Sequence, residues 1–196
     1  MVSEIISGQG LRFKPVTSSE WGDLEELFGP RGACGGCWCM WWRLTHTDFE
    51  RQKGDGNRDA LKKLVDSGVV PGILAYLDDQ PVGWCSVGPR EAYSALEHSR
   101  IFKRVDNKPV WSIVCFFVAK TFRCQGITSE LIGAAVDYAR NNSVEVVEAY
   151  PVDPADDRYP DIFAYTGFLS AFRKAGFTEV IRRSKSRPIV RLYICN

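Results

Sequence analysis

The sequence has almost no net charge and no apolar segment long enough to cross a membrane. Its 25 lysines and arginines balance 24 aspartates and glutamates and leave a net charge of +1, so no overall field would attract nucleic acid or an anionic membrane. The longest apolar run, 110–119, has about half the length of a membrane-spanning helix. The first ten residues lack the basic and apolar segments of a signal peptide. We therefore expect a soluble protein that has no nucleic acid and no membrane as a partner.

The cysteines give no sign of a disulfide framework. There are seven, an odd number, and Cys85, Cys115 and Cys195 lie inside apolar runs where no partner is evident. This usage is typical of reduced thiols in a cytoplasmic protein. A chain of 196 residues with 45% apolar composition can bury one generous core, so we expect residues 1–196 to form a single domain.

The segment CGGCWC groups Cys34, Cys37 and Cys39, and His46 follows it. Structural zinc normally takes four ligands, often as two paired sets, and the chain has no second CxxC. We therefore predict no metal and interpret the segment as an ordered loop. A metal-sensing or redox-sensing loop is the alternative.

The order of apolar patterns predicts a mixed α/β fold. A run that is apolar at nearly every position, 110–118, is typical of a central strand covered on both faces. A helical pattern follows it, so the next strand should run parallel to it. We expect a mixed sheet of about seven strands flanked by helices. The expected strands are 11–16, 72–79, 81–88, 110–118, 144–150, 178–184 and 189–195, and the expected helices are 17–28, 57–68, 91–104, 129–140 and 168–177.

The turn RCQGIT, 123–128, joins the central strand to that helix. The first N–H groups of a helix are unpaired and lie at the positive end of its dipole. Gly126 would let a phosphate approach the backbone closely, and Arg123 adds a charge with fork geometry. The turn lacks the lysine of a Walker A loop and the three glycines of a dinucleotide fingerprint. An anion site and an ordinary glycine turn both remain open on this pattern alone.

The longer segment FFVAKTFRCQGITSELIGAAVDYA, 116–139, resembles the acetyl-CoA-binding segment of the GNAT N-acetyltransferases. The family pattern is Arg/Gln-x-x-Gly-x-Gly/Ala, and Thr128 stands where the family has a small residue. KAGF at 174–177 resembles a second family element. The resemblance implies a GNAT-like acyl-CoA N-acyltransferase fold, whose central sheet is splayed at the CoA site.

The resemblance also implies acetyl-CoA as the co-substrate and identifies the residues that would bind it. The pantetheine arm would pair with the strand backbone at Phe116, Phe117 and Val118. The diphosphate would take the backbone amides of Arg123, Cys124, Gln125, Gly126, Ile127 and Thr128.

The catalytic groups are less evident, because the position of the family's usual acid, a tyrosine, holds Phe172. Tyr150 and Tyr165 are the nearby replacements. Glu148 is the first candidate for the base, because it lies two residues before Tyr150 and so on the same strand face. Each of these side chains also has a purely structural interpretation. Asp106 and Asp153 are further candidates for the base.

The acceptor of such an enzyme would be an amine, most simply on a small molecule. Trp38, Trp41 and Trp42 lie in the cysteine-rich loop, where they either fill the core or line a substrate cleft. The loop 151–161 carries four aspartates that could form the rim for a cationic amine or be simply solvated. A CoA-binding or ligand-binding sensor without turnover is the alternative to an enzyme. The oligomeric state stays open, a homodimer included.

Overall fold

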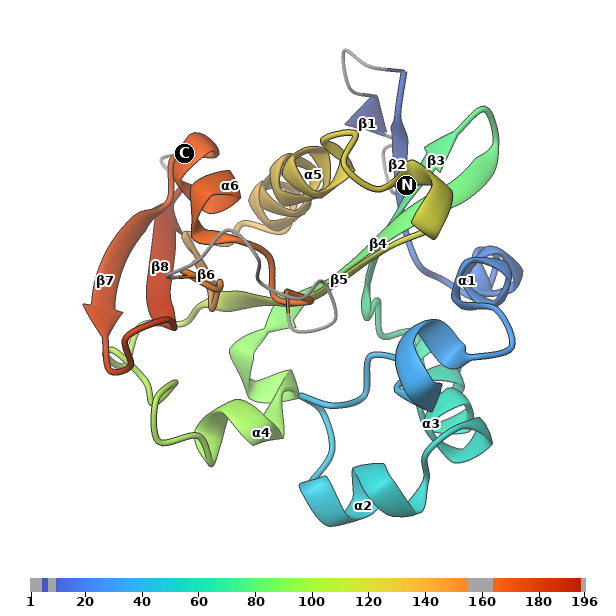
Figure 1. The fold of residues 1–196 in the computed structure, drawn as a ribbon, viewed down its shortest axis with the longest axis horizontal. Coiled ribbons are helices and arrows are strands. Elements are labelled where there is room, and N and C mark those ends of the chain that lie inside the picture. Colours follow the sequence, from blue (N-terminus) through green and yellow to red (C-terminus); the bar gives the residue numbers. More distant parts are fainter. Residues whose placement is uncertain (1–4, 7–9, 155–163, 195–196) are drawn as a thin grey trace.

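The computed structural model describes residues 5–6, 10–154 and 164–194, and a mixed sheet organises them (Figure 1). Its strands are β1 (Ile5–Ile6), β2 (Arg12–Pro15), β3 (Gly72–Leu77), β4 (Gln80–Pro89), β5 (Trp111–Val118), β6 (Val146–Ala149), β7 (Thr178–Arg182) and β8 (Pro188–Tyr193). Their order in the sheet is β1-β2-β3-β4-β5-β6-β8-β7. β5 and β6 are parallel, while the other neighbours are antiparallel. The predicted fold class is therefore confirmed, with the two-residue β1 added to the seven expected strands.

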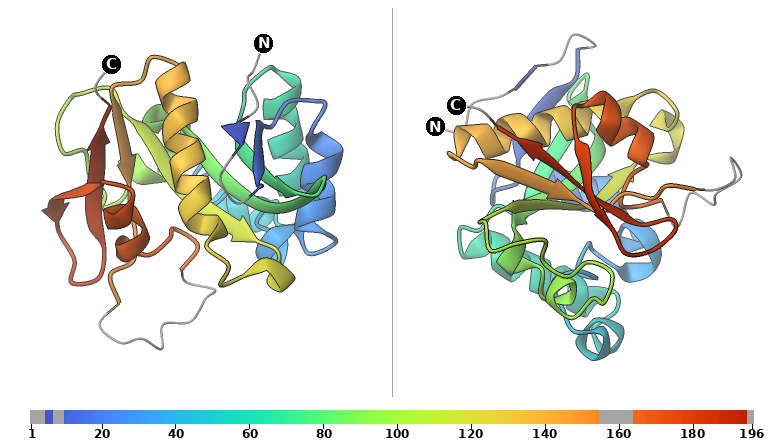
Figure 2. Two further views of the ribbon diagram at one scale, coloured as in Figure 1. Left: turned by 90° about the horizontal axis from the view of Figure 1, so that it is seen from above. Right: turned by 90° about the vertical axis from the view of Figure 1, so that its left-hand side faces the viewer.

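Helices cover both faces of the sheet (Figures 1 and 2). They are α1 (Trp21–Phe28), α2 (His46–Arg51), α3 (Asp55–Asp66), α4 (Ser94–Glu97), α5 (Ile127–Asn141) and α6 (Leu169–Lys174), with single turns η1 (Gly32–Gly36), η2 (Arg90–Ala92) and η3 (Lys120–Phe122). One apolar cluster joins the sheet to α5 and α6, and a second joins it to α1, α3 and the cysteine-rich loop. Both faces of the central strands are therefore buried, which explains why β5 is apolar at nearly every position.

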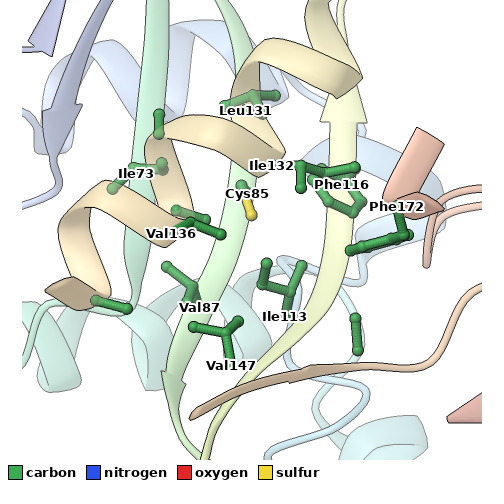
Figure 3. Packing of buried hydrophobic residues seen from close by; sticks show 14 of the residues in the cluster. Ile73, Cys85, Val87, Ile113, Phe116, Leu131, Ile132, Val136, Val147 and Phe172 are labelled. Carbon is green, nitrogen blue, oxygen red and sulfur yellow. The ribbon is translucent and has the colours of Figure 1, made fainter. Parts of the chain in front are cut away.

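α5 lies directly over the central strands (Figure 3). Leu131 and Ile132 are fully buried on its inner face and belong to one cluster with Cys85 and Phe116. Gly83 of β4 makes this close approach possible, because a Cβ there would lie 3.0 Å from the Ile127 side chain and 3.1 Å from that of Leu131. The helix therefore begins next to the end of β5, where the RCQGIT turn must form.

The helix predicted over 91–104 is wrong. Only η2 and α4 form there, and the chain from 98 to 110 is irregular. Side chains and the neighbouring loop take over backbone partners in this region: Arg90 Nη2 donates to the Phe102 carbonyl at 2.7 Å, and the Ala95 N–H donates to the Trp42 carbonyl at 3.1 Å. Tertiary contacts therefore replace the helical hydrogen bonds that the local pattern favoured.

Candidate active site

The RCQGIT turn has the backbone of an anion site. Cys124 and Gly126 both adopt positive φ, 60° and 82°, and Gly126 is the N-terminal cap of α5. A Cβ added at Gly126 would meet nothing within 4 Å. The glycine is thus favoured by its left-handed conformation, and the space in front of it is open.

The amides of this turn are available to a ligand. Within the described residues, none of the N–H groups from Cys124 to Thr128 donates a hydrogen bond to another group. The first intrahelical bonds of α5 begin at Ser129 and Glu130, which both donate to the Gly126 carbonyl. Arg123 lies across the turn and donates from Nε to the Val118 carbonyl at 3.2 Å. Unpaired amides at a helix N-terminus next to a guanidinium form a ready site for a diphosphate.

β5 and β6 separate next to this turn, and a β-bulge explains where. β5 pairs with β6 only from Trp111 to Ile113. On its other edge, Ser86 of β4 pairs with Cys115 and Val87 pairs with Ile113, so Val114 is one residue too many. A bulge of this kind bends a strand and increases its twist. The remainder of β5 therefore diverges from β6 immediately after the bulge.

The edge of β5 that faces this gap is partly covered. The Phe116 N–H donates to the Tyr165 carbonyl at 2.6 Å. On the opposite edge, the Ala119 N–H donates to the Val82 carbonyl of β4. Since alternate residues of a strand direct their polar groups to opposite edges, Phe116 and Val118 face the gap and Phe117 faces β4. Of the three residues predicted to contact pantetheine, Phe116 and Val118 therefore direct their backbone polar groups to the gap, and Phe117 does not.

The structure brings Glu148 and Tyr150 together but buries both. The Tyr150 hydroxyl donates to Glu148 Oε1 at 2.6 Å, and the same oxygen accepts from Arg90 Nη1 at 2.9 Å. Arg191 Nε donates to the other carboxylate oxygen at 2.8 Å. The Glu148 side chain is only 1% exposed. Burial and the adjacent carboxylate raise the pKa of Tyr150 well above its ordinary value. All partners of Glu148 are donors, so an incoming amine could reach it only by breaking these bonds.

The other two carboxylates considered as bases are ion-paired at the surface. Asp106 accepts from Arg191 at 2.7 Å, and this hydrogen bond lowers the pKa of the carboxyl group. Asp153 lies 2.7 Å from Arg182. The other aspartates of the predicted acidic rim, at 156, 157 and 161, lie outside the described residues. Sequence reasoning missed Arg90 and Arg191. Arg191 lies between Val190 and Leu192 inside an apolar strand pattern, and a charge in such a run could have indicated a buried ion pair.

The tyrosine candidates differ in their surroundings. Phe172 is fully buried, packs between Phe116 and Phe177, and leaves no hydroxyl at the position of the usual acid. Tyr165 is half-buried and lines a pocket. Burial raises its pKa to about 12, so its phenol is protonated at neutral pH.

This pocket, of about 360 Å³, lies between the tryptophan-rich loop, the segment after α4 and Tyr165. Trp41 and Trp42 line it, whereas Trp38 is buried and stacks on Trp21 at 6.1 Å between ring centroids. Trp38 therefore fills the core, whereas Trp41 and Trp42 form one wall of the pocket. Through Tyr165, the pocket borders the gap beside β5.

Of the cysteines in this loop, Cys39 packs against the sheet, while Cys34 is exposed. Cys39 Sγ lies 2.7 Å from Cys115 Sγ and accepts from the Trp84 indole N–H at 3.0 Å. Burial raises the pKa of Cys37 to about 11. Across the described part of the chain, no three histidine, cysteine, aspartate or glutamate side chains are grouped to hold a metal ion, and no helix is long and apolar enough to span a membrane.

Comparisons with known proteins agree with this arrangement. The model of the Acetyltransferase (GNAT) family matches residues 38–165. The fold is similar to a GNAT acetyltransferase from Listeria monocytogenes, with 10% identity, a TM-score of 0.59 and coverage of 98% of this chain and 100% of that one. The PaiA N-acetyltransferase of Thermoplasma acidophilum, solved with coenzyme A, has 12% identity and a TM-score of 0.53, and the match covers 94% and 99% of the chains. An agmatine N-acetyltransferase, as a mutant apo form, has 11% identity and a TM-score of 0.55, with 94% and 99% covered. A search of curated protein sequences found no significant match.

Proposed function

The chain belongs to the GNAT acetyltransferase family, and from that premise we propose that it moves an acetyl group from acetyl-CoA to the amine of a small molecule. The amine would attack the thioester directly. The observation that carries the proposal is the row of available amides from Cys124 to Thr128 at the start of α5, beside the gap between β5 and β6.

The residues present fit coenzyme A. The diphosphate would lie on the amides of the turn, with Arg123 adding charge, and these donors are held by α5 and the strand end without side-chain rearrangement. When bound, acetyl-CoA supplies the thioester that is attacked. The Phe116 N–H now donates to the Tyr165 carbonyl, so we propose that Tyr165 gives up this bond when the pantetheine arm pairs with β5.

The proposed acid follows from accessibility. Tyr165 lines the pocket with a protonated phenol, so it is the better-placed donor to the leaving thiolate. Glu148 and Tyr150, which the sequence favours as base and acid, are buried in one hydrogen-bonded network with Arg90 and Arg191. We propose that this network positions β5, β6 and β8 around the gap, and that Glu148 and Tyr150 act through it.

A non-catalytic CoA sensor is the second candidate, favoured by the buried Phe172 at the position of the usual acid. Incubation with acetyl-CoA and a range of amines separates the two functions, with released CoA measured by mass spectrometry. An enzyme releases CoA and forms an acetylated amine in equal amounts. A sensor shows saturable CoA binding and no amine-dependent release.

The cofactor site has its own test. Arg123→Ala should weaken CoA binding about tenfold, from about 1.5 kcal/mol of lost charged hydrogen bonding. Arg140→Ala is the matched control, because Arg140 is an exposed arginine in the last turn of the same helix. Equal CoA affinity of both variants in calorimetry would refute the assignment of the turn.

The remaining expectations also belong to the proposal. One sheet contains β1 from the start of the described chain and β8 from its end, which supports one catalytic domain over residues 1–196. The six described cysteines are free thiols, which suits the expected cytoplasmic location.

A further inference from the structure

Two buried cysteine sulfurs meet where the cysteine-rich loop touches the central strand. Cys39 Sγ of the loop lies 2.7 Å from Cys115 Sγ of β5, although the two residues are 76 positions apart in the chain. Both are free thiols, and the two residues are only 3% and 8% exposed. The sulfur atoms of a disulfide are about 2.05 Å apart, so a movement of about 0.7 Å would join this pair. Neither thiol has a part in the proposed acetyl transfer.

The backbone of the loop is strained at this contact. Trp38 and Cys39 adopt positive φ, 44° and 53°, and Ala33 of the same loop adopts 67°. The left-handed region is unfavourable for residues that carry a Cβ. Such conformations persist only where the surrounding structure holds them, and they cluster at functional sites. The strain is thus found at the residue whose sulfur contacts β5.

The other cysteines of the loop are placed differently. Cys34 and Cys37 form a CxxC pattern, which by spacing alone is typical of redox chemistry. However, Cys37 Sγ donates to the Gly32 carbonyl of its own loop at 3.7 Å, and Cys34 is exposed. The structure therefore favours a long-range pair over the pair that the spacing suggests.

We propose that Cys39 and Cys115 form a reversible disulfide when the protein meets hydrogen peroxide. Both sulfurs are buried, so the oxidant must be about as small as a water molecule, and peroxide meets this condition. In a reducing compartment such a bond is transient and responds to oxidants. Trp41 and Trp42, which follow Cys39 in the loop, form one wall of the pocket. The bond therefore fixes this wall to β5, and its formation does not depend on the proposed function.

The bond forms in two balanced steps. The Cys39 sulfur attacks one oxygen of the peroxide, the O–O bond breaks, and the leaving hydroxide takes the thiol proton to become water, which leaves a sulfenic acid on Cys39. The Cys115 sulfur then attacks the sulfenic sulfur, and the hydroxyl group leaves with the second thiol proton as another water. The two thiols thus lose two electrons and two protons to the peroxide.

The surroundings of the two sulfurs fit this order. The Trp84 indole N–H donates to Cys39 Sγ at 3.0 Å, so a donor is in place for the negative charge of the attacking thiolate. The hydrogen bond with Cys39 and burial raise the pKa of Cys115 well above its ordinary value. Cys115 therefore keeps its proton until the second step.

The test uses the full chain, first reduced and then treated with a small molar excess of hydrogen peroxide. Digestion without reduction, followed by mass spectrometry with fragmentation, should show the peptide of Cys39 joined to that of Cys115 with the loss of two hydrogens. Dithiothreitol should separate the two peptides. Because the bond closes a loop across 76 positions, Tm should rise by about 10 °C on oxidation.

Variants locate the effect. Cys39→Ala and Cys115→Ala should show no rise in Tm after peroxide treatment. Cys34→Ser is the matched control, because Cys34 is an exposed thiol of the same loop, and it should keep both the joined peptides and the rise in Tm. Should either alanine variant fail to fold, the peptide map of the unchanged chain still decides the question.

Three results would overturn the proposal. The first is a disulfide between Cys34 and Cys37 in place of the long-range bond. The second is oxidation of Cys39 to a product that dithiothreitol does not reverse, such as a sulfinic acid. The third is a pair of free thiols at Cys39 and Cys115 after peroxide treatment.

Discussion

Replacement of Glu148 by glutamine separates a structural role of this residue from a catalytic one. Its carboxylate accepts from Arg90 at 2.9 Å, Arg191 at 2.8 Å and Tyr150 at 2.6 Å, and both arginine side chains are at most 2% exposed. Glutamine has nearly the same shape but no charge, so two buried guanidinium groups lose their shared counter-ion. Removal of one partner from a buried ion pair costs about 3–5 kcal/mol.

We expect the lower end of this range, because each arginine keeps a second carboxylate. Arg191 retains Asp106 at 2.7 Å, and Arg90 retains Glu97 at 3.1 Å, although both acidic side chains are 39% exposed. A loss of about 3 kcal/mol corresponds to a fall in Tm of about 6–12 °C in a chain of this size. Glu145→Gln is the matched control, since Glu145 is exposed one residue before β6, and it should change the free energy of unfolding by less than about 0.5 kcal/mol.

The assay is urea unfolding followed by tryptophan fluorescence, together with kcat for the acetylated amine at a temperature where both variants are folded. A positioning role predicts the stability loss with substantial residual turnover. The reasoning is refuted if the free energy of unfolding of Glu148→Gln lies within about 1 kcal/mol of that of the unchanged protein while its kcat falls by a factor of about 100 or more. Such a fall in kcat is typical of a lost general base.

Three further predictions concern the backbone and one thiol. Gly126→Ala should destabilise the fold by about 1–2 kcal/mol, because a Cβ is unfavourable at φ 82°, and should weaken CoA binding in calorimetry; an affinity equal to that of the unchanged protein would contradict the role of the turn. Gly72→Ala should lower the stability of the fold by about 3 kcal/mol, since the new Cβ would overlap the Cys85 carbonyl oxygen. Gly133→Ala, at an open position of α5, should raise the stability by about 0.5–1 kcal/mol. Chemical unfolding ranks the two variants, and the reverse order would be inconsistent with the packing. The pKa of Cys37 is raised from 9.0 to about 11, so the contribution of this thiol to stability is complete below pH 9 and is lost as the pH rises through 11. Between pH 9 and 11, the Tm of the unchanged protein should therefore fall more steeply than the Tm of Cys37→Ala. Identical profiles of Tm against pH would show that the thiol does not contribute.

Tertiary contacts decided the chemistry around Glu148 and Tyr165. Strand alternation correctly places Glu148 and Tyr150 on one face, but only the fold brings Arg90 to them from the end of β4 and Arg191 from β8. Side chains 43 and 58 residues away neutralise this carboxylate, and no local pattern contains such distances. The pocket has the same origin, because Trp42, Phe102 and Tyr165 come from three separate segments.

By itself, the sequence determined the sheet, its central strand and the glycine turn, because each depends on local periodicity or on a single residue's backbone preference. The helix predicted over 91–104 did not form, since Arg90 and Trp42 supply partners that lie outside that window. Only the tertiary structure decided where β5 leaves β6, through the bulge at Val114, and which side chains face the gap. These features depend on contacts between residues far apart in the chain, which a local pattern cannot specify.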